Sequence, residues 1–172
     1  MPRRRVAVAL LVPEPIATEI DGIRRALGDS ALPTVVPHIT LVSPVNVRAD
    51  DLPVAVDELR GGPAKVRPFT LTLGPAVTFH PVTPVVYLDV EETAPIVALR
   101  ESITGGTFSR PDTYPFVPHV TIAMEMEPAR IDAALHALAD YRADVTFNAI
   151  DLLEDRAPGP RRWNSIACVR LG

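Results

Sequence analysis

The sequence has 172 residues, of which 47% are hydrophobic, and its formal net charge is −4. This apolar content excludes a disordered chain and suffices for one domain or for two small lobes around a shared core. The acidic balance argues against a broad basic surface for duplex nucleic acid, although it permits a local arginine patch.

The sequence also bears on compartment and membrane contact. No stretch approaches the ~18 consecutive apolar residues that a membrane span requires. Cys168 is the single cysteine and has no partner in the chain for a disulfide, which suits a reducing compartment. We therefore expect a cytoplasmic protein without membrane contact, and we expect it to be a monomer.

The first half of the chain predicts the element order strand, helix, strand, helix, strand. The opening strand is continuously apolar, as in strands that are covered on both faces. Gly28 ends the first helix, and Asp50 or Asp51 can cap the second helix. Gly74 suggests a bulge in the last strand. The predicted strands cover residues 6–12, 37–43, 69–73 and 76–80, and the predicted helices cover residues 14–27 and 52–60.

The second half of the chain repeats this element order. No linker separates the halves, because residues 81–84 are too few and too rich in proline to form one. The repetition indicates an internal duplication, so we expect a single α+β domain, residues 1–172, built from two pseudo-symmetric lobes. The predicted strands here cover residues 85–90, 118–122, 145–153 and 163–171, and the predicted helices cover residues 94–104 and 128–141.

Two nearly identical stretches carry the strongest functional signal. Residues 37–41 read Pro-His-Ile-Thr-Leu, and residues 118–122 read Pro-His-Val-Thr-Ile. Side chains alternate between the faces of a strand, so in each copy the histidine and the threonine share one face. Because the chain has only 4 histidines, two matching copies strongly indicate a functional pair. The candidate catalytic residues are His38, Thr40, His119 and Thr121.

Two imidazoles on opposite sides of one site suit in-line displacement at phosphorus. One can take a proton from the attacking hydroxyl or water while the other gives a proton to the leaving oxygen. The ordinary pKa of histidine permits both roles near neutral pH. Threonine hydroxyls can donate hydrogen bonds to the non-bridging oxygens as negative charge grows on them. This chemistry requires no metal and no other cofactor.

On these residues the sequence resembles the 2H phosphoesterases, whose name refers to two His-x-Ser/Thr motifs, and among them the 2′-5′ RNA ligase and cyclic phosphodiesterase group. The resemblance covers both motifs, the distance between them and the last strand from Trp163. It implies a duplicated bilobal α+β fold, with two antiparallel-rich sheets and outer helices around a central cleft. It also implies that the four motif residues are catalytic.

The same resemblance implies a reaction and a class of partner. The enzyme would open a 2′,3′-cyclic phosphate, or would reversibly join RNA ends through a 2′-5′ linkage. Its partners would be small nucleotides or single-stranded RNA ends that carry a cyclic phosphate, and not duplex nucleic acid.

Residues outside the motifs are weaker candidates for substrate binding. Tyr114 and Phe116 lie on the loop that enters the second motif and can stack on a base or ribose, or can instead cover the junction of the lobes. Arg162 lies beside Trp163 and can contact a phosphate or a base, although an arginine in a turn is usually solvated. Arg110 and Arg161 resemble Arg162 in this respect. We expect His136 at the surface, and His80 either solvated in a turn or lining the cleft.

Other classes of function compete with this interpretation. A non-catalytic module that binds nucleotides or RNA would use the same cleft but would not need both motifs intact. A metal-dependent hydrolase with His38 and His119 as ligands normally needs further ligands, and neither motif has an adjacent carboxylate. A ferredoxin-like RNA-binding sheet fits poorly, because the strands lack paired exposed aromatic residues.

Overall fold

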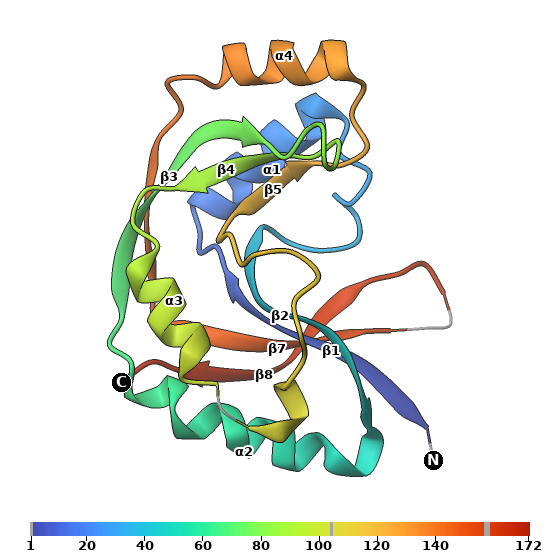
Figure 1. Ribbon diagram of the computed structural model, residues 1–172, viewed down its shortest axis with the longest axis vertical. Helices are drawn as coiled ribbons and strands as arrows, with labels where there is room; N and C mark the ends of the chain where they lie inside the picture. The colour runs from blue at the N-terminus through green and yellow to red at the C-terminus, as the bar shows by residue number, and fades with distance from the viewer. Residues whose placement is uncertain (1, 104, 157–158) are drawn as a thin grey trace.

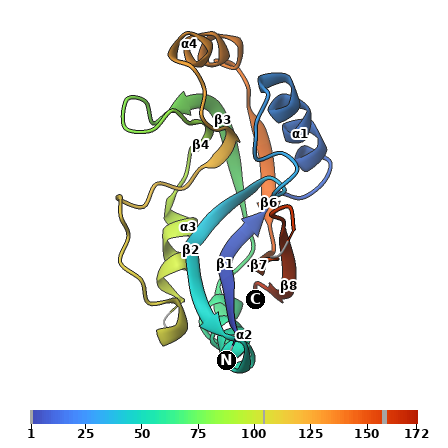
Figure 2. The ribbon, with the colours of Figure 1, turned by 90° about the vertical axis from the view of Figure 1, so that its right-hand side faces the viewer.

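One curled antiparallel sheet organises the chain (Figures 1 and 2). The computed structural model describes residues 2–103, 105–156 and 159–172, and within them the sheet has eight strands in the order β6-β3-β4-β5-β2-β1-β7-β8. The strands are β1 (Arg3–Leu11), β2 (His38–Arg48), β3 (Phe69–Thr78), β4 (Val86–Val90), β5 (Val120–Ala123), β6 (Ala143–Phe147), β7 (Ala149–Asp155) and β8 (Trp163–Arg170). The helices are α1 (Ile16–Leu27), α2 (Leu52–Gly61), α3 (Ala94–Glu101) and α4 (Pro128–Ala137).

The predicted order of strands and helices is confirmed in both halves, but the prediction of one strand over residues 145–153 is wrong. The chain forms β6 and β7 there, separated by Asn148, whose carbonyl oxygen accepts a hydrogen bond of 2.9 Å from the Leu171 amide. β6 pairs with β3 and β7 pairs with β1, so the chain crosses from one half of the sheet to the other at this residue. Apolar residues stand on both sides of Asn148, so the composition alone does not mark the break.

Backbone hydrogen bonds, and not capping side chains, satisfy the C-terminal end of α1 and the N-terminal end of α2. Gly28 ends α1 in the left-handed region with φ 71°, as predicted, and its amide donates to the last turn of the helix. Asp51 precedes α2 but makes no capping hydrogen bond, because a short 3-10 turn over Ala49–Asp51 already gives the Leu52 amide a carbonyl partner. The α3 and α4 helices end earlier than predicted, and Thr104 lies outside the described residues.

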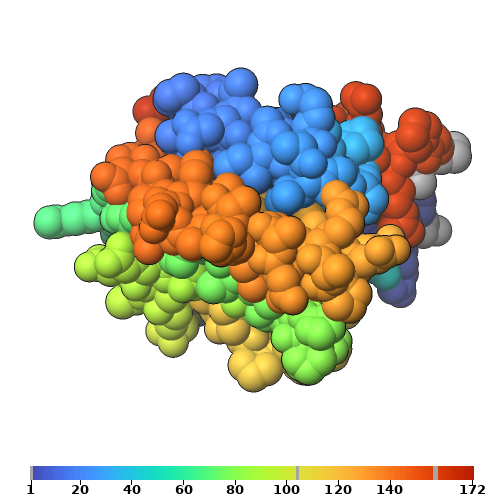
Figure 3. Space-filling model, turned by 90° about the horizontal axis from the view of Figure 1, so that it is seen from above, coloured from blue at the N-terminus to red at the C-terminus, as the bar shows by residue number. Residues whose placement is uncertain are grey.

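Each helix pair covers a different half of the sheet. The α1 and α4 helices lie side by side over β3, β4 and β5, as Figures 1 and 3 show, and the Tyr141 hydroxyl donates to Glu19 at 2.7 Å between these segments. The α2 and α3 helices contact the β2-β1-β7-β8 half. The α1 helix thus packs on β5 and not on the strand that precedes it. Among the described residues, no helix is long and apolar enough to cross a membrane.

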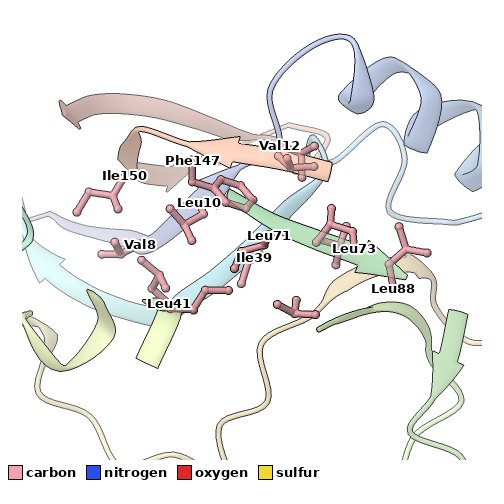
Figure 4. Close-up of a cluster of buried hydrophobic side chains, with 14 of the residues drawn as sticks. Val8, Leu10, Val12, Ile39, Leu41, Leu71, Leu73, Leu88, Phe147 and Ile150 are labelled. Carbon is pink, nitrogen blue, oxygen red and sulfur yellow. The ribbon is translucent and has the colours of Figure 1, made fainter. Parts of the chain in front are cut away.

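A continuous apolar core lies on the face of the sheet that the helices cover. Side chains of β1, β2, β3, β4, β6 and β7 meet there, as Figure 4 shows. Leu10, Ile39, Leu73 and Leu88 are each 0% exposed. At about 25 cal/mol per Å² of buried apolar surface, this core supplies most of the drive for folding. It leaves the opposite face of the central strands available for polar side chains.

The α+β class and the antiparallel-rich sheet are confirmed. The two expected sheets are joined into one, because β2 and β5 pair at a single register position, Ile39 with Val120. We infer that the two halves are duplicated lobes of one domain, a proposal that the repeated element order supports.

The predicted bulge at Gly74 gives a test of the fold. The register of β3 with β4 shifts between Leu73 and Ala76, and Gly74 has φ 107°. A Cβ at this position would overlap the carbonyl oxygen of Tyr141. We expect Gly74→Ala to lower the free energy of unfolding by about 1–3 kcal/mol, because it adds backbone strain and a clash.

Gly22 provides the matched control in α1, because a Cβ there would meet nothing within 4 Å. Gly22→Ala should raise the free energy of unfolding by up to about 1 kcal/mol through helix propensity. Urea denaturation of both variants measures these changes. Equal stability of the two variants would contradict the requirement for glycine at the Gly74 bulge.

Candidate active site

β2 and β5 bring the two motifs together at the centre of the sheet. The strands are antiparallel and pair through Ile39 and Val120. Extending this register by one residue each way places each motif histidine opposite the threonine of the other motif. The histidines then occupy one diagonal of a rectangle and the threonines the other, with diagonal Cα atoms about 7–8 Å apart. The facing pairs of this motif quartet are His38 with Thr121 and Thr40 with His119.

Strand alternation separates the quartet from the core. Ile39 and Val120, which lie within the two motifs, are 0% exposed on the core side. The two histidines and two threonines of the quartet are only partly buried and belong to the opposite face of the sheet. A one-residue slip of either strand would exchange these faces, so the burial of the apolar residues fixes the direction of the polar ones.

Both histidines are held by the same local hydrogen bond. His38 Nδ1 lies 2.8 Å from the carbonyl oxygen of Val36, and His119 Nδ1 lies 2.6 Å from that of Val117. A carbonyl oxygen only accepts, so Nδ1 carries a proton in each ring. In the neutral imidazole, Nε2 is therefore the atom that can accept a proton from a ligand.

A cavity of about 620 Å³ opens beside the quartet, within the usual range for small-molecule sites. His119, Thr40 and Thr121 line it, whereas His38 does not. The rest of its wall is largely apolar and comes mainly from the β3–β4 turn and from residues 110–117, which we call the cavity loop, with further residues from β2 and from just after β5. Its apolar lining residues are Leu41, Phe79, Val82, Val85, Pro111, Tyr114, Pro115, Phe116, Val117 and Met124.

Two aromatic rings that sequence analysis missed hold the imidazole of His119. Phe79 and Tyr87 stack at 4.1 Å between ring centroids. The His119 ring lies edge-on to both, with centroid distances of 5.0 Å to Phe79 and 5.2 Å to Tyr87. Tyr87 pairs with Thr121 in the sheet, so only the register of β4 with β5 could have placed it here.

The first motif has a different neighbour, the buried Arg24 of α1. This side chain is 2% exposed, and it donates to Asp29 at 2.8 Å and to the Val35 carbonyl oxygen at 2.9 Å. Burial lowers the pKa of His38, and the charge of Arg24 lowers it further, against the opposing effect of the hydrogen bond to Val36. Burial likewise lowers the pKa of His119. Both rings therefore favour the neutral form more than an exposed histidine does.

A second arginine, Arg100 of α3, joins the cavity loop to β2. Its Nε donates to the Leu41 carbonyl oxygen at 3.1 Å, directly after the first motif. Its guanidinium also pairs with Asp112 and lies 4.1 Å from the ring centroid of Phe116. Arg110 adds a second attachment by donating to the Pro44 carbonyl oxygen. These contacts fix the loop that forms one wall of the cavity.

The weaker candidates divide between the cavity and the surface. Tyr114, which is 61% exposed, and Phe116 line the cavity, as does Arg110. Arg162 is exposed on the β7–β8 hairpin and does not line the cavity. His80 and His136 are exposed, as expected. In the part of the chain that the structure describes, no group of three or more His, Cys, Asp or Glu side chains is placed to hold a metal ion.

Comparison with known proteins identifies the family. The family model of the 2′-5′ RNA ligase superfamily matches residues 12–158. The chain belongs to this superfamily. Proteins of Bacillus thuringiensis (strain Al Hakam) and Bacillus cereus (strain AH187), whose names carry the word phosphoesterase, are each 33% identical over 170 residues, covering 98% of this chain and 97% of theirs. The resemblance to 2H phosphoesterases is thereby confirmed.

Solved structures of other proteins share the fold. E. coli LigT complexed with 3′-AMP superposes with a TM-score of 0.74 at 19% identity, over 99% of both chains. LigT in its apo form gives 0.70 at 20% identity over the same share. The protein TT0787 of Thermus thermophilus gives 0.67 at 18% identity, over 97% of both chains. At these identities the likeness establishes the fold alone.

The Arg100 contacts predict a defect in binding more than in chemistry. Arg100→Met removes the donors to Leu41 and Asp112, so the cavity loop should loosen. The KM for a substrate that binds in the cavity should then rise about tenfold, equivalent to ~1.4 kcal/mol. The kcat should change little. Hydrogen exchange of residues 109–117 should increase with it. Arg60→Met, at an exposed arginine of α2, is the control and should change neither. If Arg100→Met changes KM and hydrogen exchange no more than the control does, Arg100 does not fix the cavity loop.

Proposed function

We propose that this member of the 2′-5′ RNA ligase superfamily is a metal-independent phosphoesterase that opens 2′,3′-cyclic phosphates of nucleotides or RNA ends. Reversible 2′-5′ joining of RNA ends is the related activity of the same site. The observation that carries the proposal is the motif quartet, with two histidines on one diagonal and two threonines on the other. We further propose that the protein acts as a monomer in the cytoplasm.

The diagonal arrangement suits displacement at a phosphorus atom held between the four side chains. One imidazole accepts a proton from the attacking water, and the other, as imidazolium, donates a proton to the ribose oxygen that leaves. The water oxygen becomes bonded to phosphorus as the ring bond to that ribose oxygen breaks, so the product is a phosphate monoester. The threonine hydroxyls can donate to the two non-bridging oxygens. The catalytic set is thus His38, Thr40, His119 and Thr121.

The cavity supports a nucleoside as the bound group. Its volume and its aromatic and aliphatic walls fit a base and ribose beside the phosphate, with Tyr114 and Phe116 as stacking residues. LigT has been solved with 3′-AMP, ATP and NADP+, so that protein accommodates adenine nucleotides. We extend this ligand class to the present chain on the basis of its own cavity.

The quartet predicts the effects of single substitutions. His38→Ala and His119→Ala should each lower kcat/KM on a nucleoside 2′,3′-cyclic phosphate by roughly 10²–10⁴-fold, because each removes one proton-transfer group. Thr40→Ala and Thr121→Ala should cost up to roughly 10³-fold, as for the loss of one oxyanion donor. The His38→Ala/His119→Ala double variant should lose much less than the product of the single losses, because the two residues act as a unit.

All variants should be assayed with and without EDTA, and circular dichroism serves as the folding control. Activity that disappears in EDTA and returns with one added divalent metal would contradict the metal-independent mechanism. Near-normal turnover by either folded histidine variant would contradict the two-histidine mechanism. Nucleotide binding without turnover by the intact protein would favour the non-catalytic module.

The lowered histidine pKa values predict an acidic pH optimum. Turnover requires one ring to be neutral and the other protonated, so kcat/KM falls below the lower pKa and above the higher one. Burial lowers both pKa values, so the alkaline limb should begin below about 6.5, the ordinary pKa of histidine. Tyr87→Leu, which removes one ring that covers His119, should move one limb toward higher pH. An unchanged profile would contradict this account.

A further inference from the structure

A group of arginines lies outside the cavity, near the start of β1, the end of β7 and the start of β8. Arg5 and Arg161 both approach one carboxylate, Asp155, at 3.6 and 3.9 Å, and the Arg5 guanidinium lies 5.7 Å from the ring centroid of Trp163. Arg162 is the exposed neighbour of Arg161. We call Arg5, Arg161, Arg162 and Trp163 the arginine patch. Two of these arginines pair with the single carboxylate and Arg162 adds a third cation, so the patch has a net positive charge, although the whole chain has a net charge of −4.

The arginine patch faces the same side of the sheet as the motif quartet. Ala9 pairs with Thr40, and the register shifts between β1 and β2 add residues to β2, so β1 alternates regularly from Ala9 to Arg5. Arg5 pairs with Asp155, which in turn pairs with Trp163. Residues directly paired across antiparallel strands share a face. Arg5, Asp155 and Trp163 therefore share the quartet's face of the sheet, opposite the apolar core, and Arg161 reaches Asp155 from the hairpin.

The patch also lies close to the mouth of the cavity. Ser43 lines the cavity, and three residues later Asn46 pairs with Arg5. Three residues of strand span about 10 Å, and neighbouring strands lie about 5 Å apart. Arg110, a cavity residue that donates to the Pro44 carbonyl oxygen, stands between the two regions. Arg110 thus adds one cation between the cavity and the arginine patch.

We propose that the arginine patch binds the backbone phosphates of a single-stranded RNA whose terminal cyclic phosphate occupies the cavity. This inference rests on the proposed function and extends it from mononucleotides to RNA ends. Exposed guanidinium groups pair with phosphate oxygens, and Trp163 offers an aromatic face near them. The patch is too small to hold a duplex by counter-charge alone, which favours a single strand with its end in the cavity.

The decisive comparison uses two substrates with the same terminal nucleotide. One is a nucleoside 2′,3′-cyclic phosphate, and the other is a hexaribonucleotide that ends in that cyclic phosphate. Arg161→Ala/Arg162→Ala should lower kcat/KM about tenfold or more on the oligonucleotide and leave it unchanged on the mononucleotide. The matched control is Arg60→Ala/Arg67→Ala, which removes the same charge from exposed arginines elsewhere. It should affect neither substrate.

A binding measurement separates this inference from the proposed function. Fluorescence anisotropy of a hexaribonucleotide ending in a 3′-phosphate, titrated at several salt concentrations, requires no turnover. Loss of two phosphate contacts should make the slope of log K against log salt shallower by about 1.4. If the wild-type protein turns over neither substrate, the proposed function fails while this measurement still tests the patch. Equal affinity and slope in the patch and control variants, or equal losses on both substrates, would overturn the inference.

Discussion

The pairing of β2 with β5 is the contact on which the site depends. It is limited to one register position, Ile39 with Val120, yet it joins the two halves of the sheet. Because both residues are fully buried, the apolar core holds the register, and the register sets the four polar residues into facing pairs. The geometry of the site is therefore a consequence of packing on the opposite face of the same strands.

Two of the helices pack on strands other than the ones that they follow in the chain, and this packing supports the β2–β5 contact. α1 follows β1 in the chain but packs on β5, and α3 follows β4 but packs on β2. Each half of the sheet is thus covered by one helix from each half of the sequence. The halves cannot separate without exposing the apolar side chains between strands and helices, which stabilises the central contact. Because α3 packs on β2, Arg100 of α3 can attach the cavity loop to β2.

The two histidines share a hydrogen-bond geometry but not a surrounding. In both, a carbonyl oxygen two residues earlier orients the ring and fixes the proton on Nδ1. His119 lies against two aromatic rings and lines the cavity, whereas His38 lies near the buried charge of Arg24. Different surroundings allow two chemically identical groups to differ in proton affinity. The duplicated motif supplies the groups, and the unequal neighbours supply that difference.

The sequence by itself identified most of the elements and the four residues of the motif quartet, because strand alternation and the two similar pentapeptides are local properties. It also placed Tyr114 and Phe116 on the loop that lines the cavity. Only the tertiary structure decided that residues 145–153 divide at Asn148, since β6 pairs with β3 and β7 pairs with β1 in the other half of the sheet. Tyr87, Phe79, Arg24 and Arg100 likewise reach the site through register and helix packing. Such contacts join residues far apart in sequence, and no local pattern encodes them.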